Sequence, residues 1–146
     1  MTATPTEAPK NAAASADELP ELRQILNVSE AAMDHAMGFA YQLYVAGRHA
    51  QAVQVCQALI ACDRRYWWPH SLLAASLRRL ERYDEALQAV KRGLEHEPLQ
   101  PKLLLMRGEL QIIIARRNTA ARAGAREEAA ARSIAGAPML RLAAGT

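Results

Sequence analysis

Aromatic residues are scarce in this chain. Only 5% of its 146 residues are aromatic (two Trp, four Tyr and one Phe), whereas 51% are apolar and alanine supplies much of that total. This balance argues against a β-sandwich, which needs more β-branched and aromatic side chains, and it favours packed helices. The length fits one domain. The sequence therefore predicts a single all-α domain.

Cysteines and long apolar runs are also rare. Cys56 and Cys62 lie six residues apart on one predicted helix, so they face different sides and cannot easily form a disulfide. Reduced thiols fit a reducing compartment. No stretch approaches the roughly 18 apolar residues of a membrane span, and the first ten residues lack the apolar core of a secretory signal. We expect a cytoplasmic protein with no membrane insertion.

The residue patterns that carry catalysis are missing. His35, His49, His70 and His96 lie in different predicted units, without ligand-like spacing to cysteine or acidic residues. The chain has no glycine-rich phosphate loop and no nucleophile elbow. The net charge of +3 is too mild for a nucleic-acid footprint. We therefore expect no enzyme, no catalytic residues, no metal, no cofactor and no nucleic-acid partner.

One pattern stands out: a repeat with a period of 34 residues. Residues 47–63 (GRHAQAVQVCQALIACD) correspond to residues 81–97 (ERYDEALQAVKRGLEHE). Ala52 matches Ala86 and Gln54 matches Gln88 at this spacing. A third copy is indicated by the spacing of Ala40, Ala74 and Gly108. A fixed period of about 34 residues is typical of the tetratricopeptide repeat (TPR), a helix–turn–helix unit that stacks into a solenoid.

The apolar spacing predicts about three such units. Helices are expected over residues 30–46, 49–62 and 67–80, then a fourth that Pro98 stops, and a fifth over 103–114 that Pro101 can begin. A third outer helix, rich in alanine and arginine and interrupted by Gly124, should cap the stack. The predicted domain covers residues 18–133, in units of about 33–66, 67–100 and 101–133. Residues 1–17 and 134–146 are predicted to be flexible tails.

In a TPR the first helix of each pair lines a concave surface, and the second helix supports it from outside. Small residues are expected where helices cross, namely Ala52 and Ala86 in the outer helices and Ala40, Ala74 and Gly108 in the inner ones. His49 and Tyr83 should occupy the aromatic corner after each turn. An apolar stripe on the inner helices predicts a peptide-binding groove, because such exposed patches usually mark partner sites. Its predicted residues are Met37, Tyr41, Tyr44, Val45, Trp68, Ser71, Leu72, Ala75, Arg78, Arg79, Leu105, Met106, Glu109, Ile112 and Ile113.

Three segments resemble a particular TPR family, the type III secretion chaperones for translocator proteins (the SycD/LcrH class). They are residues 39–48 (FAYQLYVAGR), 56–63 (CQALIACD, with a large Leu59 where most TPRs have a small residue) and 82–86 (RYDEA). The likeness covers about residues 20–116. It implies a cytoplasmic virulence chaperone that keeps a pore-forming translocator soluble before export by holding a short extended segment in its groove. Met37, Tyr41 and Tyr44 fall on positions that contact this segment in the family.

Other interpretations stay open at this point. The chain is alternatively a different TPR adaptor, either a needle-subunit chaperone or a general protein–protein scaffold. The five arginines of residues 116–132 stand against Glu127 and Glu128 and form either a solvated helix face or a weak contact with nucleic acid or another anionic surface. The absence of stacking aromatics there favours the solvated face over a nucleic-acid contact. A homodimer is a further alternative, through residues 22–26 or the ends of the stack.

Overall fold

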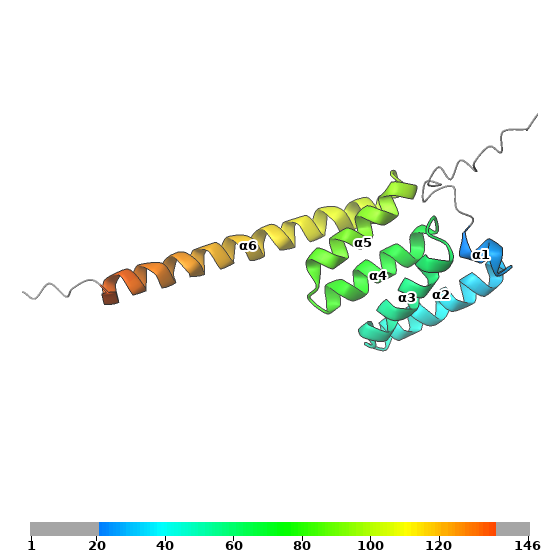
Figure 1. Ribbon diagram of the computed structural model, residues 1–146, viewed down its shortest axis with the longest axis horizontal. Helices are drawn as coiled ribbons and strands as arrows, with labels where there is room; N and C mark the ends of the chain where they lie inside the picture. The colour runs from blue at the N-terminus through cyan, green and yellow to red at the C-terminus, as the bar shows by residue number, and fades with distance from the viewer. Residues whose placement is uncertain (1–20, 137–146) are drawn as a thin grey trace, which may run out of the picture.

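The computed structural model describes residues 21–136, which form six α-helices and no strand. The helices are α1 (Leu22–Ile25), α2 (Glu30–Val45), α3 (His49–Cys62), α4 (Trp67–Arg79), α5 (Tyr83–His96) and α6 (Pro101–Gly136). Helices α2 to α5 form a compact stack, and α6 runs along α5 before projecting well beyond it (Figure 1). The predicted all-α fold is confirmed. The predicted tail 1–17 and residues 137–146 lie outside the described residues, whereas residues 134–136, predicted to begin the C-terminal tail, belong to α6.

Each helical hairpin turns in the same way, 34 residues apart. Gly47 follows α2 with a φ of +78°, and the amide of Arg48 donates to the carbonyl of Leu43 at 2.8 Å. Glu81 follows α4 with a φ of +60°, and the amide of Arg82 donates to the carbonyl of Leu77 at 2.9 Å. A residue in the left-handed region satisfies the last carbonyls of a helix and reverses the chain. The sequence repeat is therefore a repeat of the backbone turn.

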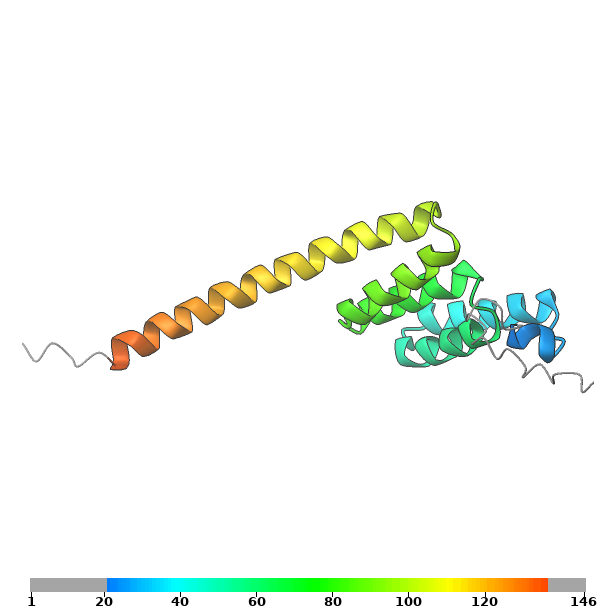
Figure 2. The same cartoon turned by 45° about the horizontal axis from the view of Figure 1, so that its top comes forward.

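The helices form two layers, an inner one of α2, α4 and α6 and an outer one of α3 and α5, and neighbouring helices are closer together in the inner layer. Helix α4 contacts α3 and α5 extensively, and it also contacts α2 and α6. Among the described helices α3 and α5 do not contact one another. Inner helices that touch and outer helices that spread apart give a curved stack whose concave side is formed by α2, α4 and α6. The turned view in Figure 2 shows the same succession of hairpins.

The core lies between these layers and is built largely from small and medium aliphatic side chains. Ala40, Ala74, Ala52 and Ala86 are fully buried, as expected for residues at helix crossings. Small residues allow the helix backbones to approach, and larger ones fill the space between them. The remaining core comprises Met33, Met37, Leu43, Val53, Cys56, Leu59, Leu72, Leu73, Leu77, Ala89, Val90, Leu94, Leu103 and Leu110.

Three helices approach closely at Gly93 in α5. A Cβ atom there would lie 2.9 Å from the Cβ of His70 in α4 and 2.9 Å from Leu103 Cδ1 in α6. His70 is 2% exposed, and its Nε2 donates to the carbonyl of Arg64 at 3.0 Å. Its Nδ1 is buried without a hydrogen-bond partner among the described residues. Burial therefore lowers the pKa of His70 below its ordinary value of 6.5.

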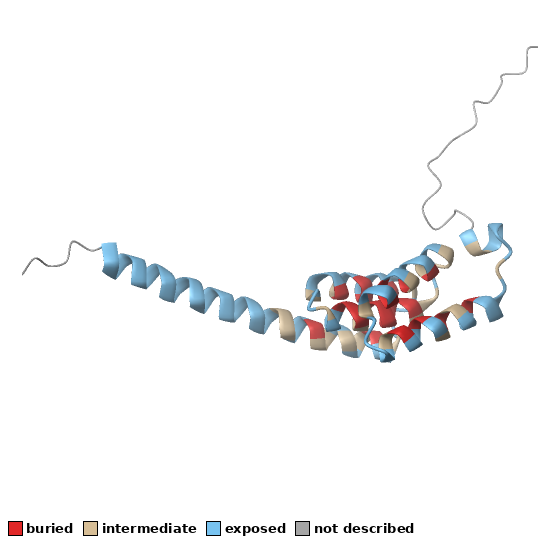
Figure 3. Ribbon diagram, turned by 90° about the horizontal axis from the view of Figure 1, so that it is seen from below, coloured by how far each residue is buried: buried red, intermediate tan, exposed pale blue. Residues whose placement is uncertain are grey.

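The third unit differs from the prediction. Residues 101–136 form one continuous helix, so the predicted fifth helix over 103–114 continues without a turn and the third outer helix is absent. Alanine, arginine and glutamate are strong helix formers, and one glycine costs only about 1 kcal/mol in a helix interior, so Gly124 does not end the helix. From residue 115 onward every described residue is exposed (Figure 3). We call residues 115–136 the α6 arm.

The missing outer helix also changes the role of Gly108. It was predicted to sit at a close helix crossing like Ala40 and Ala74, but a Cβ added at Gly108 would meet no atom within 4 Å. The prediction is wrong because a crossing needs a second helix of the same unit, and none packs there. Leu105 and Ile112 are accordingly 65% and 54% exposed.

The short helix α1 is attached to the end of α3 by charged groups. Arg23 Nη1 lies 3.1 Å from Asp63 Oδ2, and Arg64 Nε lies 3.5 Å from Glu21 Oε1. The apolar side chains Leu22, Ile25 and Leu26 remain exposed. Within residues 21–136, no helix combines the length and apolar character needed to cross a membrane.

Candidate peptide-binding groove

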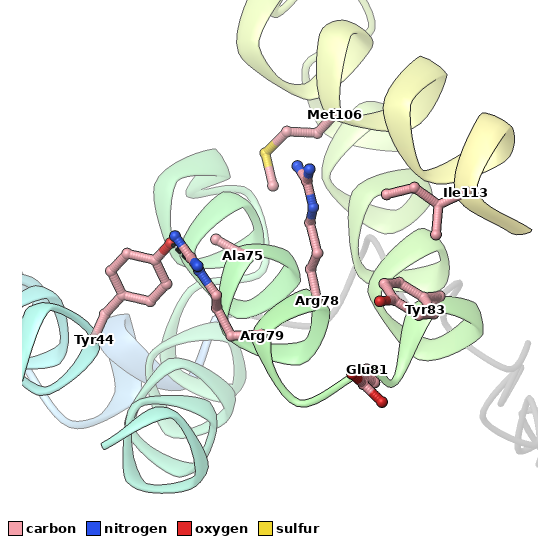
Figure 4. A pocket seen from close by; sticks show the side chains of 8 residues that line it. All are labelled: Tyr44, Ala75, Arg78, Arg79, Glu81, Tyr83, Met106 and Ile113. Carbon is pink, nitrogen blue, oxygen red and sulfur yellow. Dashed lines mark hydrogen bonds between the residues drawn. The ribbon is translucent and has the colours of Figure 1, made fainter. Parts of the chain in front are cut away.

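A concave cavity of about 490 Å³ lies between the inner helices, near the C-terminal ends of α2 and α4. Figure 4 shows side chains from α2, α4 and α6 surrounding it. Its apolar part comes from Ala75, Met106 and Ile113, and its aromatic part from Tyr44 and Tyr83. The cavity is lined by Tyr44, Ala75, Arg78, Arg79, Glu81, Tyr83, Met106 and Ile113. We call this surface, together with the neighbouring Tyr41 and Val45, the groove.

Tyr44 is held in place from two sides. Its ring packs edge-on against His49 with centroids 5.2 Å apart, and it stacks with Tyr41 at 6.4 Å. Its hydroxyl accepts a hydrogen bond from Arg79 Nε at 3.5 Å, which raises the pKa of Arg79. An aromatic side chain fixed in this way offers a rigid apolar surface with one polar edge.

An ion pair spans the groove from α4 to α6. Arg78 Nη1 lies 2.6 Å from Glu109 Oε2. Both side chains are more than 40% exposed, so the pair contributes about 0–1 kcal/mol to stability. Its main effect is to neutralise the charge of Arg78 beside the cavity.

The structure brings together part of the predicted groove. Tyr44, Ala75, Arg78, Arg79, Met106 and Ile113 all line the cavity. Tyr41 and Val45 are 51% and 67% exposed, and they occupy the same repeat positions as Ala75 and Arg79. Glu109 joins the groove through its pair with Arg78. Whether these residues bind a peptide stays a prediction.

Three predicted groove residues lie in the core instead. Met37 is 0% exposed, Ser71 is 1% exposed and Leu72 is 5% exposed. The Ser71 hydroxyl donates to the carbonyl of Trp68 at 2.9 Å, so its polar group is satisfied inside its own helix. The prediction of groove-facing side chains is wrong at these positions. They lie on the side of each inner helix that packs into the stack, and helical spacing alone does not separate that side from the concave one.

Three further predicted residues lie elsewhere on the surface. Trp68 is half-buried at the start of α4 and packs edge-on against Tyr66 at 6.5 Å, away from the cavity lining. Leu105 and Ile112 lie on α6 but do not line the cavity. Both are exposed because no helix follows α6 in the stack.

Sequence reasoning missed two residues of the cavity. Tyr83 begins α5 and Glu81 lies in the turn before it, so neither belongs to an inner helix. The signal for Tyr83 was present, since it matches His49 at the 34-residue spacing and His49 contacts Tyr44. The corner aromatic therefore forms part of the wall of the groove as well as the packing of the turn.

No three His, Cys, Asp or Glu side chains within residues 21–136 are grouped closely enough to hold a metal ion. Cys56 and Cys62 are free thiols, and burial raises the pKa of Cys56 to about 12, so it stays protonated. Burial and a hydrogen bond to Asp34 raise the pKa of Tyr66 to about 12. Both groups are neutral at physiological pH.

The fold is similar to two solved structures. Over 66% of this chain it superposes on 72% of the type III secretion translocator chaperone SycD from Yersinia enterocolitica, with a TM-score of 0.64 and 18% sequence identity. It also superposes, over 66% of its length, on 64% of a chain in a T3SS complex from Aeromonas hydrophila, with a TM-score of 0.63 and 20% identity. No family model and no curated protein matches the sequence. At such identity the likeness shows the fold, and the TPR-like solenoid is confirmed.

Proposed function

We propose that this chain is a cytoplasmic chaperone that holds an extended segment of a secreted translocator protein in the groove and keeps it soluble before type III export. The observation that carries the proposal is the groove itself, where half-buried Tyr44 on α2 lies across α4 from Met106 and Ile113 on α6. Tyr41 and Val45 add exposed apolar surface on the same helix as Tyr44. The shared fold with a translocator chaperone supports the same function.

The physical basis is the cost of leaving apolar segments in water. A translocator carries membrane-active segments that aggregate when exposed, and a surface of tyrosine, methionine and isoleucine can cover one of them. Methionine adapts to irregular shapes, and tyrosine adds contact area at low entropic cost. Because the inner helices are already packed against α3 and α5, little ordering free energy is lost by the chaperone on binding.

The proposal is tested by co-expression with the translocator proteins of a type III secretion system from the same genome. The wild-type chain should retain a translocator in the soluble fraction and co-purify with it. Tyr41→Asp should weaken the complex by about 30-fold or more, because it replaces an aromatic contact beside the cavity with a charge. The matched control is Phe39→Asp on the same helix: Phe39 is 54% exposed, close to the 51% of Tyr41, but lies outside the groove.

Two results would argue against this function. If Tyr41→Asp and Phe39→Asp both bind a translocator like the wild type, the segment is not held in the groove. If the chain retains no translocator but binds a needle subunit or an unrelated protein, the adaptor alternative is correct. Size-exclusion chromatography of the same samples measures whether the chain is a homodimer.

A further inference from the structure

The charge of the groove is concentrated at one place in the repeat. Spacing by 34 residues makes Arg78 equivalent to Tyr44 and Ile112, and it makes Arg79 equivalent to Val45 and Ile113. The two neighbouring inner helices therefore carry uncharged side chains where α4 carries two arginines. At these repeat positions, a segment lying across the groove would meet cationic groups only over α4.

Helix capping does not require this arginine pair. Basic residues near a helix C-terminus are favoured by about 0.3–1 kcal/mol through the helix dipole. The last turn of α4 holds Arg78 and Arg79, but the last turn of the equivalent helix α2 holds no basic residue and ends through the same kind of turn. The arginines are thus a local departure from a repeat that folds without them.

The two arginines differ in how far they are neutralised. Arg78 is paired with Glu109 at 2.6 Å. Arg79 takes part in no ion pair among the described residues, and its Nε meets only the uncharged hydroxyl of Tyr44 at 3.5 Å, the long limit for a hydrogen bond. Glu81 also lines the cavity, but Figure 4 shows its side chain at the rim, directed away from both guanidinium groups.

We propose that Arg79 is a specificity-determining residue that selects client segments carrying an aspartate or glutamate between apolar residues. This inference rests on the proposed function of the groove. A carboxylate placed over α4 would pair with Arg79, while flanking apolar side chains would contact Tyr44 on one side and Met106 and Ile113 on the other. Packed helices lie about 8–10 Å apart, an extended chain rises about 3.3 Å per residue, and its alternate side chains face the same way. The flanking apolar residues should therefore lie two or four positions from the acidic one.

Covering the groove strengthens this pairing. In the open protein Arg79 is exposed and hydrated, and its charge is screened. A bound segment removes part of that water, so that the guanidinium and a carboxylate form charge-assisted hydrogen bonds of greater strength. A client segment without an acidic residue would cover the same cation without a partner, which lowers its affinity.

The test is selection from a random library of displayed dodecapeptides by the full-length chain. Four proteins are compared: wild type, Arg79→Gln, Arg79→Lys, and Arg48→Gln as a matched control, because Arg48 is exposed and lies outside the groove. Wild type and Arg48→Gln should enrich peptides that combine apolar residues with Asp or Glu. Arg79→Gln should keep the preference for apolar residues and lose the preference for acidic ones, and Arg79→Lys should retain part of the acidic preference.

A binding measurement with one selected peptide tests the same pairing directly. Replacing its Asp with Asn should weaken binding to wild type by about three- to tenfold and leave binding to Arg79→Gln unchanged.

Each contrary result has a distinct meaning. If Arg79→Gln enriches acidic residues as strongly as wild type, or if wild type selects apolar peptides with no acidic preference, the role of Arg79 is overturned while peptide binding in the groove stands. If wild type selects no peptide at all, the result contradicts the proposed function and the inference with it. Far-UV circular dichroism of each variant verifies that the fold is unchanged.

Discussion

At the scale of single residues, the two turns that end α2 and α4 differ in a way that affects stability. Gly47 and Glu81 have the same left-handed backbone conformation, with φ of +78° and +60°. For a residue with a Cβ this conformation costs about 1–2 kcal/mol, whereas glycine adopts it freely. The second turn therefore carries backbone strain that the first does not.

Replacing Glu81 with glycine should relieve this strain. We expect Glu81→Gly to raise the free energy of unfolding by about 0.5–1 kcal/mol, after the larger unfolded-state entropy of glycine is subtracted. Gly47→Ala is the reciprocal change and should lower it by about 1 kcal/mol. Urea denaturation followed by tryptophan fluorescence measures both, and equal stabilities for Glu81→Gly and wild type would contradict the strain.

A second residue-scale prediction concerns two glycines inside helices. Gly93→Ala should lower the free energy of unfolding by about 1–2 kcal/mol, because its Cβ would lie 2.9 Å from His70 and Leu103 and the clash exceeds the gain in helix propensity. Gly108→Ala should raise it by about 0.5–1 kcal/mol, since nothing lies within 4 Å and only the propensity changes. In the same denaturation assay the two variants should change the free energy of unfolding in opposite directions. An increase for both variants would refute the close contact at Gly93.

The buried imidazole of His70 should make stability depend on pH. Burial lowers the pKa of His70 in the folded state, so the unfolded chain binds the proton more readily. The stability that neutral His70 contributes to the folded state is therefore complete only at a pH above 6.5, the ordinary pKa of histidine. Stability should fall as the pH decreases from 6.5 toward the lowered folded-state pKa, because a proton on Nδ1 would have no acceptor. Comparing urea midpoints at pH 7.5 and 5.5 tests this. His70→Gln should show a smaller decrease than wild type, and an identical decrease would assign the effect to other groups.

At the scale of helices, the sequence predicted the elements that repeat and failed where the repeat ends. The bounds of α3, His49–Cys62, match the prediction. The turn glycine Gly47 precedes the helix, and the apolar stripe that ends near Cys62 gives its length. The continuity of α6 was not predicted. Gly124 was interpreted as an interruption, but a glycine breaks a helix only when tertiary contacts favour a turn, and the α6 arm has no large apolar face that would fold back onto α5.

The α6 arm should behave independently of the stack. Gly124→Pro should reduce the far-UV helix signal, because proline removes a backbone hydrogen bond and costs about 3 kcal/mol in a helix interior. The unfolding midpoint reported by Trp67 and Trp68 in α4 should not change, since every residue of the arm is exposed and, among the described residues, its one ion pair with the stack is that of Arg117 with Asp84. Gln54→Pro, at an exposed position inside α3, is the control and should lower that midpoint strongly. A shift with Gly124→Pro would show that the arm supports the stack.

At the scale of the whole molecule, the curvature of the stack creates the groove. Inner helices that touch and outer helices that diverge bring Tyr44, Arg78 and Met106 around one cavity from three different helices. The sequence predicted these members because they recur at inner-helix positions. It misplaced Met37, Ser71 and Leu72, because the boundary between the concave side and the packed side depends on the rotation of each helix within the stack. That rotation is set by contacts across the repeat and is not visible in the spacing.

The most direct test of the groove is site-specific photo-crosslinking with a co-expressed translocator. A photoreactive phenylalanine at Met106, inside the groove, should form a covalent adduct with the translocator on irradiation. The same group at Gln88, exposed on the outer helix α5, should form none. Adducts from position 106 alone would place the client segment between α2, α4 and α6. Adducts from position 88 with none from position 106 would contradict the central claim that the concave groove holds the client.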